Sequence, residues 1–130
     1  MTRTPVQGTT PVGAYSPGII AEGRFLYVSG QGPLIDGKYD PASAEEETRL
    51  TLENIGRILA SAGAGFDDVV RCGCFLADIN DFNAFNGVYI RFMPDPPPAR
   101  STFQVGALPR GALVEIEAIA RRVQVDAVAR

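Results

Sequence analysis

The segment at residues 113–120, LVEIEAIA, most constrains the fold because it alternates strictly between two kinds of side chain. Successive residues of a strand point to opposite faces of a sheet. One face would carry four small or branched apolar residues: Val114, Ile116, Ala118 and Ala120. The other would carry Leu113, Glu115, Glu117 and Ile119. The pattern predicts a strand with one core face, while its acidic face contacts solvent, a polar pocket or another subunit.

Start signals and apolar spacing predict two helices. Ser43 followed by Glu46 fits a capping box, and Gly63 supplies a stop. The inward stripe of this first helix is Leu52, Ile55, Leu59 and Ala62. Asn80-Asp81 is expected to cap a second helix that ends at Pro94, with the stripe Phe82, Phe85, Tyr89 and Phe92. An ion pair between Glu53 and Arg57 is expected on the first helix.

Further apolar runs predict the remaining strands. A hairpin is expected over residues 18–29, turning at residues 22–24, and a buried strand at 68–78. Residues 100–105 and 113–123 give the last two strands, and the amino terminus allows one more. The order β-β-α-β-α-β-β favours an α+β fold with two helices packed on one face of a mixed sheet. We expect residues 1–130 to form a single domain.

The sequence contains no histidine, which removes the commonest general base and metal ligand. Cys72 and Cys74 lie two apart in a predicted strand, so they share a face, favour core positions and are poorly placed for a disulfide. A formal net charge of -3 gives no electrostatic footprint for nucleic acid. No apolar run is long enough to span a membrane, and the amino terminus lacks a signal-peptide pattern. We expect a cytoplasmic protein that works without a metal or cofactor.

Three prolines at positions 96–98 precede Arg100. They forbid a helix, and their stiffness lowers the entropy that is lost when the arginine is held in place. A guanidinium matches a carboxylate through two charge-assisted hydrogen bonds. Composition alone favours a surface arginine after a stiff linker.

Ser29 and Gly30 form a second ambiguous segment. They either end a strand in an ordinary turn or let a ligand approach the backbone.

Five segments match one family in their residues and in their order along the chain: GAYSPG, VSGQGP, ETRLTLENI, DINDFNAFNGVY and PPARSTFQVGALPRGALVEIEAIA. Across residues 11–122 the chain resembles the Rid family of YjgF-type reactive-intermediate deaminases, which hydrolyse enamines and imines. The resemblance implies a chorismate-mutase-like fold assembled as a homotrimer, with sites in clefts between subunits. It implies small imine, enamine or 2-keto acid ligands, and no membrane or nucleic-acid partner.

Position by position, the resemblance implies that Arg100 grips the substrate carboxylate and that Glu115 places or activates the attacking water. Glu117 shares the strand face of Glu115. The other residues assigned to the pocket are Tyr15, Ser29, Gly30, Asn86 and Thr102, of which Gly30 and Thr102 act through their backbones. Many relatives have a cysteine where this chain has Thr102, so the substrate range is left open.

The implied reaction suits a chain without histidine. A 2-aminoacrylate tautomerises to an imine, water adds to the C=N carbon, and ammonia leaves to give a 2-keto acid. An imine is already electrophilic, so orientation and proton transfer suffice. A non-catalytic trimer that binds small 2-keto acids or other carboxylates is the alternative. RNA cleavage, attributed to some relatives, is disfavoured by the pI of about 4.9 and the missing histidine.

Overall fold

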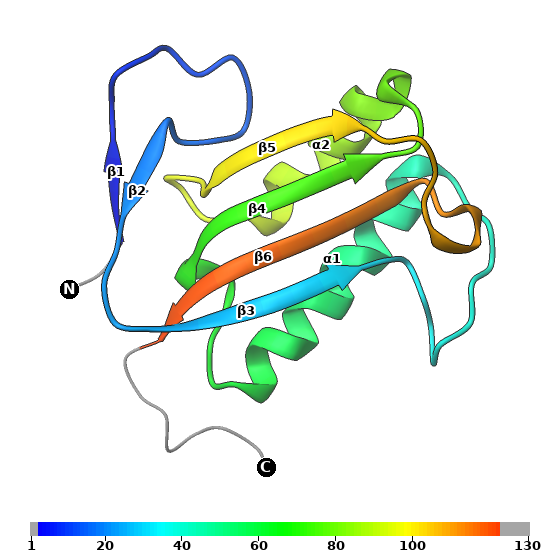
Figure 1. Ribbon diagram of the computed structural model, residues 1–130, viewed down its shortest axis with the longest axis horizontal. Helices are drawn as coiled ribbons and strands as arrows, with labels where there is room; N and C mark the ends of the chain where they lie inside the picture. The colour runs from blue at the N-terminus through cyan, green and yellow to red at the C-terminus, as the bar shows by residue number, and fades with distance from the viewer. Residues whose placement is uncertain (1–2, 123–130) are drawn as a thin grey trace.

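The computed structural model describes residues 3–122, which form a mixed four-stranded sheet with two helices on one face (Figure 1). The strand order is β3-β6-β4-β5; β6 is antiparallel to both of its neighbours, and β4 and β5 are parallel. The strands are β3 Arg24–Gln31, β4 Val69–Leu76, β5 Ala99–Gln104 and β6 Val114–Arg122. The helices are α1 Ala44–Ser61 and α2 Phe82–Phe92. This architecture confirms the predicted α+β fold.

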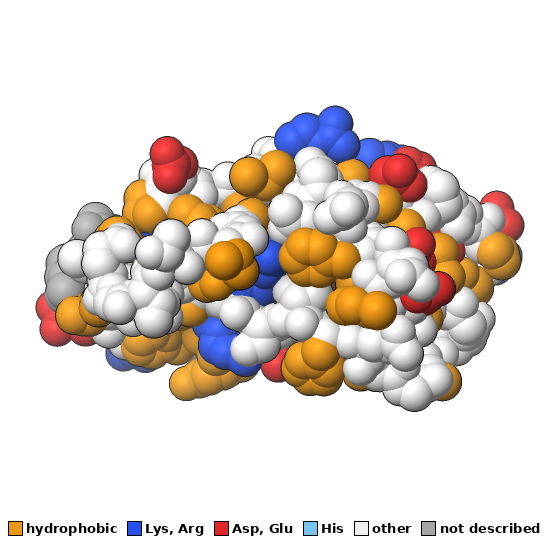
Figure 2. Space-filling model, turned by 90° about the horizontal axis from the view of Figure 1, so that it is seen from above, with side chains coloured by type: hydrophobic (Ala, Val, Ile, Leu, Met, Phe, Trp, Pro, Cys, Tyr) orange, Lys and Arg blue, Asp and Glu red, His pale blue; other side chains and the backbone are white. Residues whose placement is uncertain are grey.

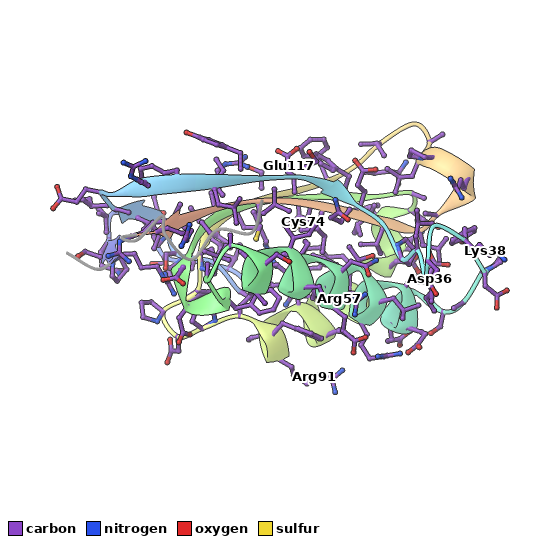
Figure 3. All side chains as sticks on the ribbon, turned by 90° about the horizontal axis from the view of Figure 1, so that it is seen from below. Asp36, Lys38, Arg57, Cys74, Arg91 and Glu117 are labelled. Atoms are coloured by element: carbon purple, nitrogen blue, oxygen red, sulfur yellow. The ribbon has the colours of Figure 1, made fainter. Side chains whose placement is uncertain are left out.

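The alternation of β6 is confirmed, because its four small or branched residues form the centre of the core. Their exposed fractions are 0% for Val114, Ile116 and Ala120 and 3% for Ala118. On β4, Cys72 is 1% and Cys74 is 0% exposed, and both are free thiols. Figure 3 shows Cys74 between the sheet and the helices and Glu117 on the opposite face of the sheet.

Helix α1 begins and ends where the sequence predicts. The Ser43 hydroxyl accepts a hydrogen bond from Glu46 N at 3.1 Å, and Gly63 follows the helix with a φ of 71°. The left-handed region costs glycine little, which explains the stop. The predicted pair between Glu53 and Arg57 is wrong, because Glu53 instead binds Arg49 at 2.6 Å. Both pairings have helical i,i+4 spacing, so spacing alone does not choose between them.

Helix α2 also follows its prediction, with one addition at its start. A 3-10 turn, Ile79–Asp81, precedes the helix, and the Asp78 carboxylate accepts from Asn80 N at 2.9 Å. Asp81 occupies the N-cap position of α2 without a side-chain hydrogen bond. The helix ends at Phe92, two residues before Pro94. Phe85 and Tyr89 are fully buried, as the stripe predicts.

The hairpin expected over residues 18–29 is wrong. Both of its strands exist, but β2, Gly18–Ile20, pairs with the amino-terminal strand β1, Thr4–Val6, in a separate two-stranded sheet. Strand β3 pairs with β6 instead. Gly23, with a φ of 124°, lies in the connection between the two sheets. The strand β2 therefore has the amino-terminal strand as its partner, and not the strand that follows it in the sequence.

The face of the sheet opposite the helices is uncovered in the part of the chain that the structure describes (Figures 1 and 3). Three large side chains are exposed on it, namely Phe25 at 39%, Tyr27 at 73% and Phe103 at 50%. Neither α1 nor α2 is long and apolar enough to cross a membrane. We call this uncovered surface the open face.

Candidate active site

Arg100 is placed by the proline segment and by a loop that packs on it. Ser16 connects the two, because its N–H donates to Pro98 O at 3.1 Å and its hydroxyl donates to Pro97 O at 2.5 Å. Ser16 is only 5% exposed. This connection brings the ring of Tyr15 within 5.9 Å of the Arg100 guanidinium carbon.

The guanidinium of Arg100 points toward α2. Its Nη1 donates to Asn86 Oδ1 at 2.7 Å, and the ring centre of Tyr89 lies 4.8 Å from Cζ. The rings of Phe82 and Phe85 are 5.6 and 5.7 Å away. Aromatic faces attract a cation, and one amide oxygen fixes the fork, so the side chain is held in one orientation.

No carboxylate lies within 4.0 Å of the Arg100 guanidinium among residues 3–122. Figure 2 looks down on the edge of the molecule near β5, where basic atoms are recessed between hydrophobic side chains. A half-buried guanidinium without a counter-charge retains donors for an anion, and a planar carboxylate fits its geometry best.

Two buried hydroxyl groups lie beside this arginine. The Tyr89 hydroxyl faces the Cys72 thiol and the Thr102 hydroxyl faces the Cys74 thiol, but neither oxygen reaches hydrogen-bond geometry with a described residue. Burial raises the pKa of Cys72 to about 11, which the charge of Arg100 opposes, and it also raises the pKa of Cys74. Both thiols are therefore neutral at physiological pH, and neither is an activated nucleophile.

Glu115 lies on β6 against a glycine of the neighbouring strand β3. A Cβ atom added to Gly30 would come within 2.5 Å of Glu115 Oε2, so the carboxylate occupies the space of the missing side chain. Glu117 lies in the same way over Gly73 of β4, where the distance would be 2.8 Å. Glu117 also approaches Arg71 Nη1 at 3.9 Å, whereas Glu115 forms no ion pair within residues 3–122. Glu115 is thus the carboxylate that stays available.

The strand register places Arg100 and Glu115 on opposite faces of the sheet. Arg100 is aligned with Cys72, whose side chain is buried under the helices. Glu115 is aligned with Phe75, and Phe75 with Phe103, so this row belongs to the open face. One chain therefore does not bring its predicted clamp and its predicted water-activating carboxylate together.

The predicted residues instead form two groups. The first, which we call the clamp half-site, contains Tyr15, Asn86, Arg100 and Thr102. The second, the carboxylate half-site, contains Ser29, Gly30 and Glu115. Ser29 and Gly30 lie where the register between β3 and β6 shifts, which places this backbone next to the Glu115 carboxylate.

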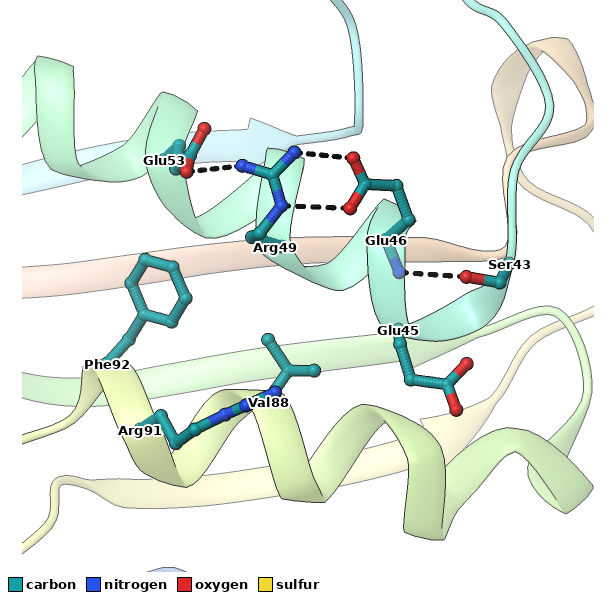
Figure 4. A pocket seen from close by; sticks show the side chains of 8 residues that line it. All are labelled: Ser43, Glu45, Glu46, Arg49, Glu53, Val88, Arg91 and Phe92. Atoms are coloured by element: carbon teal, nitrogen blue, oxygen red, sulfur yellow. Dashed lines mark hydrogen bonds and ion pairs between the residues drawn. The ribbon is translucent and has the colours of Figure 1, made fainter.

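A hollow of about 420 Å³ lies between α1 and α2 (Figure 4). It contains none of the predicted site residues. Arg49 fills part of it by bridging Glu46 and Glu53 on successive turns of α1. Because the Arg49 guanidinium is already bound by two carboxylates, the hollow offers less to an anionic ligand than the clamp half-site. No group of three potential metal ligands occurs in the described residues.

Sequence reasoning missed part of the surroundings of Arg100. The three aromatic residues Phe82, Phe85 and Tyr89 were assigned to the core, where they do lie, but they also surround the guanidinium. The i,i+3 spacing of Asn86 and Tyr89 was an available signal, since it places both on one side of a helix. Gly13 was also missed; a Cβ there would be 3.3 Å from Arg100 Nη2.

Comparisons with known proteins agree on one family. The family model described as Endoribonuclease L-PSP matches residues 7–122. A 2-iminobutanoate/2-iminopropanoate deaminase of Capra hircus is 45% identical over 111 residues, which cover 84% of this chain and 80% of that protein. Protein mmf2, mitochondrial, of Schizosaccharomyces pombe is 41% identical over 104 residues, covering 78% and 82%. The crystal structure of E. coli TdcF with bound serine has a TM-score of 0.72 and 36% identity, covering 86% of this chain and 91% of that one.

Proposed function

The chain belongs to the endoribonuclease L-PSP (YjgF/RidA) family, and on this basis we propose that it is a deaminase of the 2-iminobutanoate/2-iminopropanoate type. It would hydrolyse reactive enamine and imine intermediates, such as 2-aminoacrylate, to 2-keto acids and ammonia. Relatives that carry the name of this activity support enzymatic deamination.

The orientation of Arg100 carries the proposal. Its guanidinium is fixed by Asn86 at 2.7 Å and by the ring of Tyr89, yet it has no carboxylate partner in residues 3–122. A substrate carboxylate would supply the missing charge. The related TdcF structure holds serine, a small molecule that bears a carboxylate.

The separation of the two half-sites supports an assembly in which neighbouring chains complete each site. We propose a homotrimer in which the open face of one subunit lies against the β5 edge of the next. The carboxylate half-site of one chain would then face the clamp half-site of its neighbour. This arrangement would also cover Phe25, Tyr27 and Phe103, which a single chain leaves exposed.

Within such a cleft, each residue has a limited task. Arg100 binds the substrate carboxylate, with Tyr15 and Asn86 holding the arginine and Thr102 contributing its backbone. Glu115 accepts a proton from water as the oxygen bonds to the C=N carbon and passes this proton to the imine nitrogen, which gives the carbinolamine. The carbinolamine hydroxyl proton then passes to nitrogen as the C–N bond breaks, which releases ammonia and leaves the keto group. Ser29 and the Gly30 backbone border Glu115 and would orient the reacting groups.

The test generates 2-aminoacrylate in situ with a dehydratase and follows keto-acid release. We expect acceleration over buffer, and a loss of kcat/KM of at least about hundredfold in Arg100→Ala, because two charge-assisted bonds disappear. Arg91→Ala, which removes an exposed arginine of α2, is the matched control and should keep the wild-type rate. Full activity in Arg100→Ala would refute the clamp.

Binding without turnover distinguishes the alternative of a non-catalytic protein for small 2-keto acids. Calorimetry with 2-oxobutyrate, performed alongside the kinetic assay, measures this directly. Binding that depends on Arg100, with no acceleration of imine hydrolysis, would favour the binding protein.

A cytoplasmic location is also part of the proposal. Because one relative is named as mitochondrial, imaging of a tagged full-length chain is the suitable check.

A further inference from the structure

A small pocket of about 150 Å³ lies directly beside Glu115 and is separate from the hollow between the helices. Gly30 and Gly32 border it at the end of β3, and Glu115 borders it at the start of β6. The loop after β3 and the 3-10 turn Pro109–Gly111 supply the remaining walls. The pocket is thus part of the surface on which the proposed reaction would occur.

The walls of the pocket are mainly apolar. The residues that line it with hydrocarbon are Pro33, Leu34, Pro109, Ala112 and Val114. Arg110 also borders the pocket, but its Nη1 donates to Gly37 O at 2.7 Å, which occupies part of its charged end. Glu115 is the acidic member of the lining. Such a surface suits a hydrocarbon group attached to the atom on which Glu115 acts.

Both walls are fixed to helix α1, so the pocket is formed before a ligand arrives. Glu47 is 0% exposed, and its carboxylate accepts hydrogen bonds from Tyr39 Oη at 2.7 Å, Ala42 N at 3.0 Å and Leu113 N at 2.8 Å. The first two donors belong to the loop after β3 and the third precedes β6. One buried side chain therefore sets the spacing of the two walls.

A second residue of α1 fixes the part of the loop that contains Leu34. Asn54 Nδ2 donates to Gly32 O and to Leu34 O, each at 2.9 Å. Leu34 is half-buried, whereas its neighbour Ile35 is 56% exposed and lies outside this lining. The backbone is held on both sides of Pro33, so the position of the Leu34 side chain is well defined.

We infer that this pocket receives the side chain of the imine substrate and that Leu34 determines the largest side chain accepted. The inference rests on the proposed function and names the substrate class. A cavity of about 150 Å³ holds a group the size of benzene. Short and branched aliphatic chains fit this space, while an indole does not. The preferred substrates are imines of aliphatic 2-amino acids up to the size of leucine.

The experiment uses imines produced by an amino-acid oxidase from 2-aminobutyrate, leucine and tryptophan, with semicarbazide to trap the imine that escapes hydrolysis. We expect the full-length protein to hydrolyse the first two imines and to act at least about tenfold less efficiently on the third. Leu34→Ala should raise the ratio of kcat/KM for the tryptophan imine over the 2-aminobutyrate imine by about tenfold or more. Ile35→Ala is the matched control and should leave the ratio unchanged.

A second variant tests the same wall in the opposite direction. Ala112→Val narrows the pocket and should lower kcat/KM for the leucine imine by about tenfold relative to the 2-aminobutyrate imine. If wild type hydrolyses imines but neither substitution changes these ratios, the pocket inference is wrong and the proposed function stands. If wild type hydrolyses none of the three, both are overturned.

Discussion

At the scale of single residues, Gly30 controls the position of the Glu115 carboxylate. An alanine Cβ at residue 30 would lie 2.5 Å from Glu115 Oε2, so the carboxylate must move. We expect Gly30→Ala to lower kcat for imine hydrolysis by about hundredfold, since a displacement near 1 Å misplaces a catalytic group. Steady-state kinetics with 2-aminoacrylate measures the effect.

Gly73 provides the matched comparison for this prediction. A Cβ there would meet Glu117 Oε2 at 2.8 Å, which is a similar clash on the other neighbouring strand. If Glu115 is the water-activating residue, Gly73→Ala should retain much more activity than Gly30→Ala. Equal losses in the two variants would instead assign the effect to general distortion of β6.

The two buried thiols predict a dependence of stability on alkaline pH. Burial raises the pKa of Cys72 from 9.0 to about 11 and also raises that of Cys74. The unfolded chain loses these protons at a lower pH than the native protein, so the free energy of unfolding falls as pH rises from about 9 to about 11. Below pH 9 the contribution is complete.

Urea unfolding at pH 8 and pH 10 tests this titration. Wild type should lose about 1 kcal/mol per thiol between the two pH values, in addition to the loss from other groups. The variant Cys72→Ala with Cys74→Ala should show a correspondingly smaller loss, whatever its stability at pH 8. Identical slopes in both proteins would contradict the assignment to the thiols.

At the scale of elements, the start of α1 depends on a local signal that is visible in the sequence. Ser43 accepts from Glu46 N at 3.1 Å, so Ser43→Ala should lower the free energy of unfolding by about 1 kcal/mol. Ser61→Ala, in the last turn of the same helix, is the control and should cost less, because Ser61 caps no orphan N–H group. Urea denaturation compares them, and an equal loss would argue against capping.

Elements with strong local signals were predicted well, and pairings between elements less so. The caps of α1 and the alternation of β6 rest on neighbouring residues, and the structure reproduces both. The expected hairpin failed because the partner of β2 is set by β1, twelve or more residues away along the chain. Sequence periodicity indicates that a strand exists but contains no information about which edge it occupies.

At the scale of the whole molecule, sequence periodicity also failed to predict how the site residues from different strands lie relative to one another. Periodicity placed Glu115 correctly on the non-core face of β6, but it did not show that Arg100 points to the other side of the sheet. That relation depends on the parallel register of β4 and β5. Only the family resemblance suggested that different subunits bring the two residues together, and this assembly stays a prediction.

The open face offers a direct test of the trimer. Tyr27 is 73% exposed on this face, on the edge strand β3 that pairs with β6, and a charge there would have to be desolvated in any interface that covers the face. We expect Tyr27→Lys to reduce the mass measured by light scattering from three chains toward the single-chain value of 13.9 kDa. Imine hydrolysis should fall with it, because the half-sites would separate.

Ile90→Lys is the matched control, since Ile90 is 56% exposed on helix α2, which lies on the other side of the sheet. It should leave both the mass and the activity unchanged.

Mixing the Arg100→Ala variant with the Glu115→Gln variant tests whether subunits share sites. A mixed trimer contains some clefts formed by an intact Arg100 from one chain and an intact Glu115 from another. Recovery of activity on subunit exchange requires a shared cleft, whereas a site within one chain predicts none.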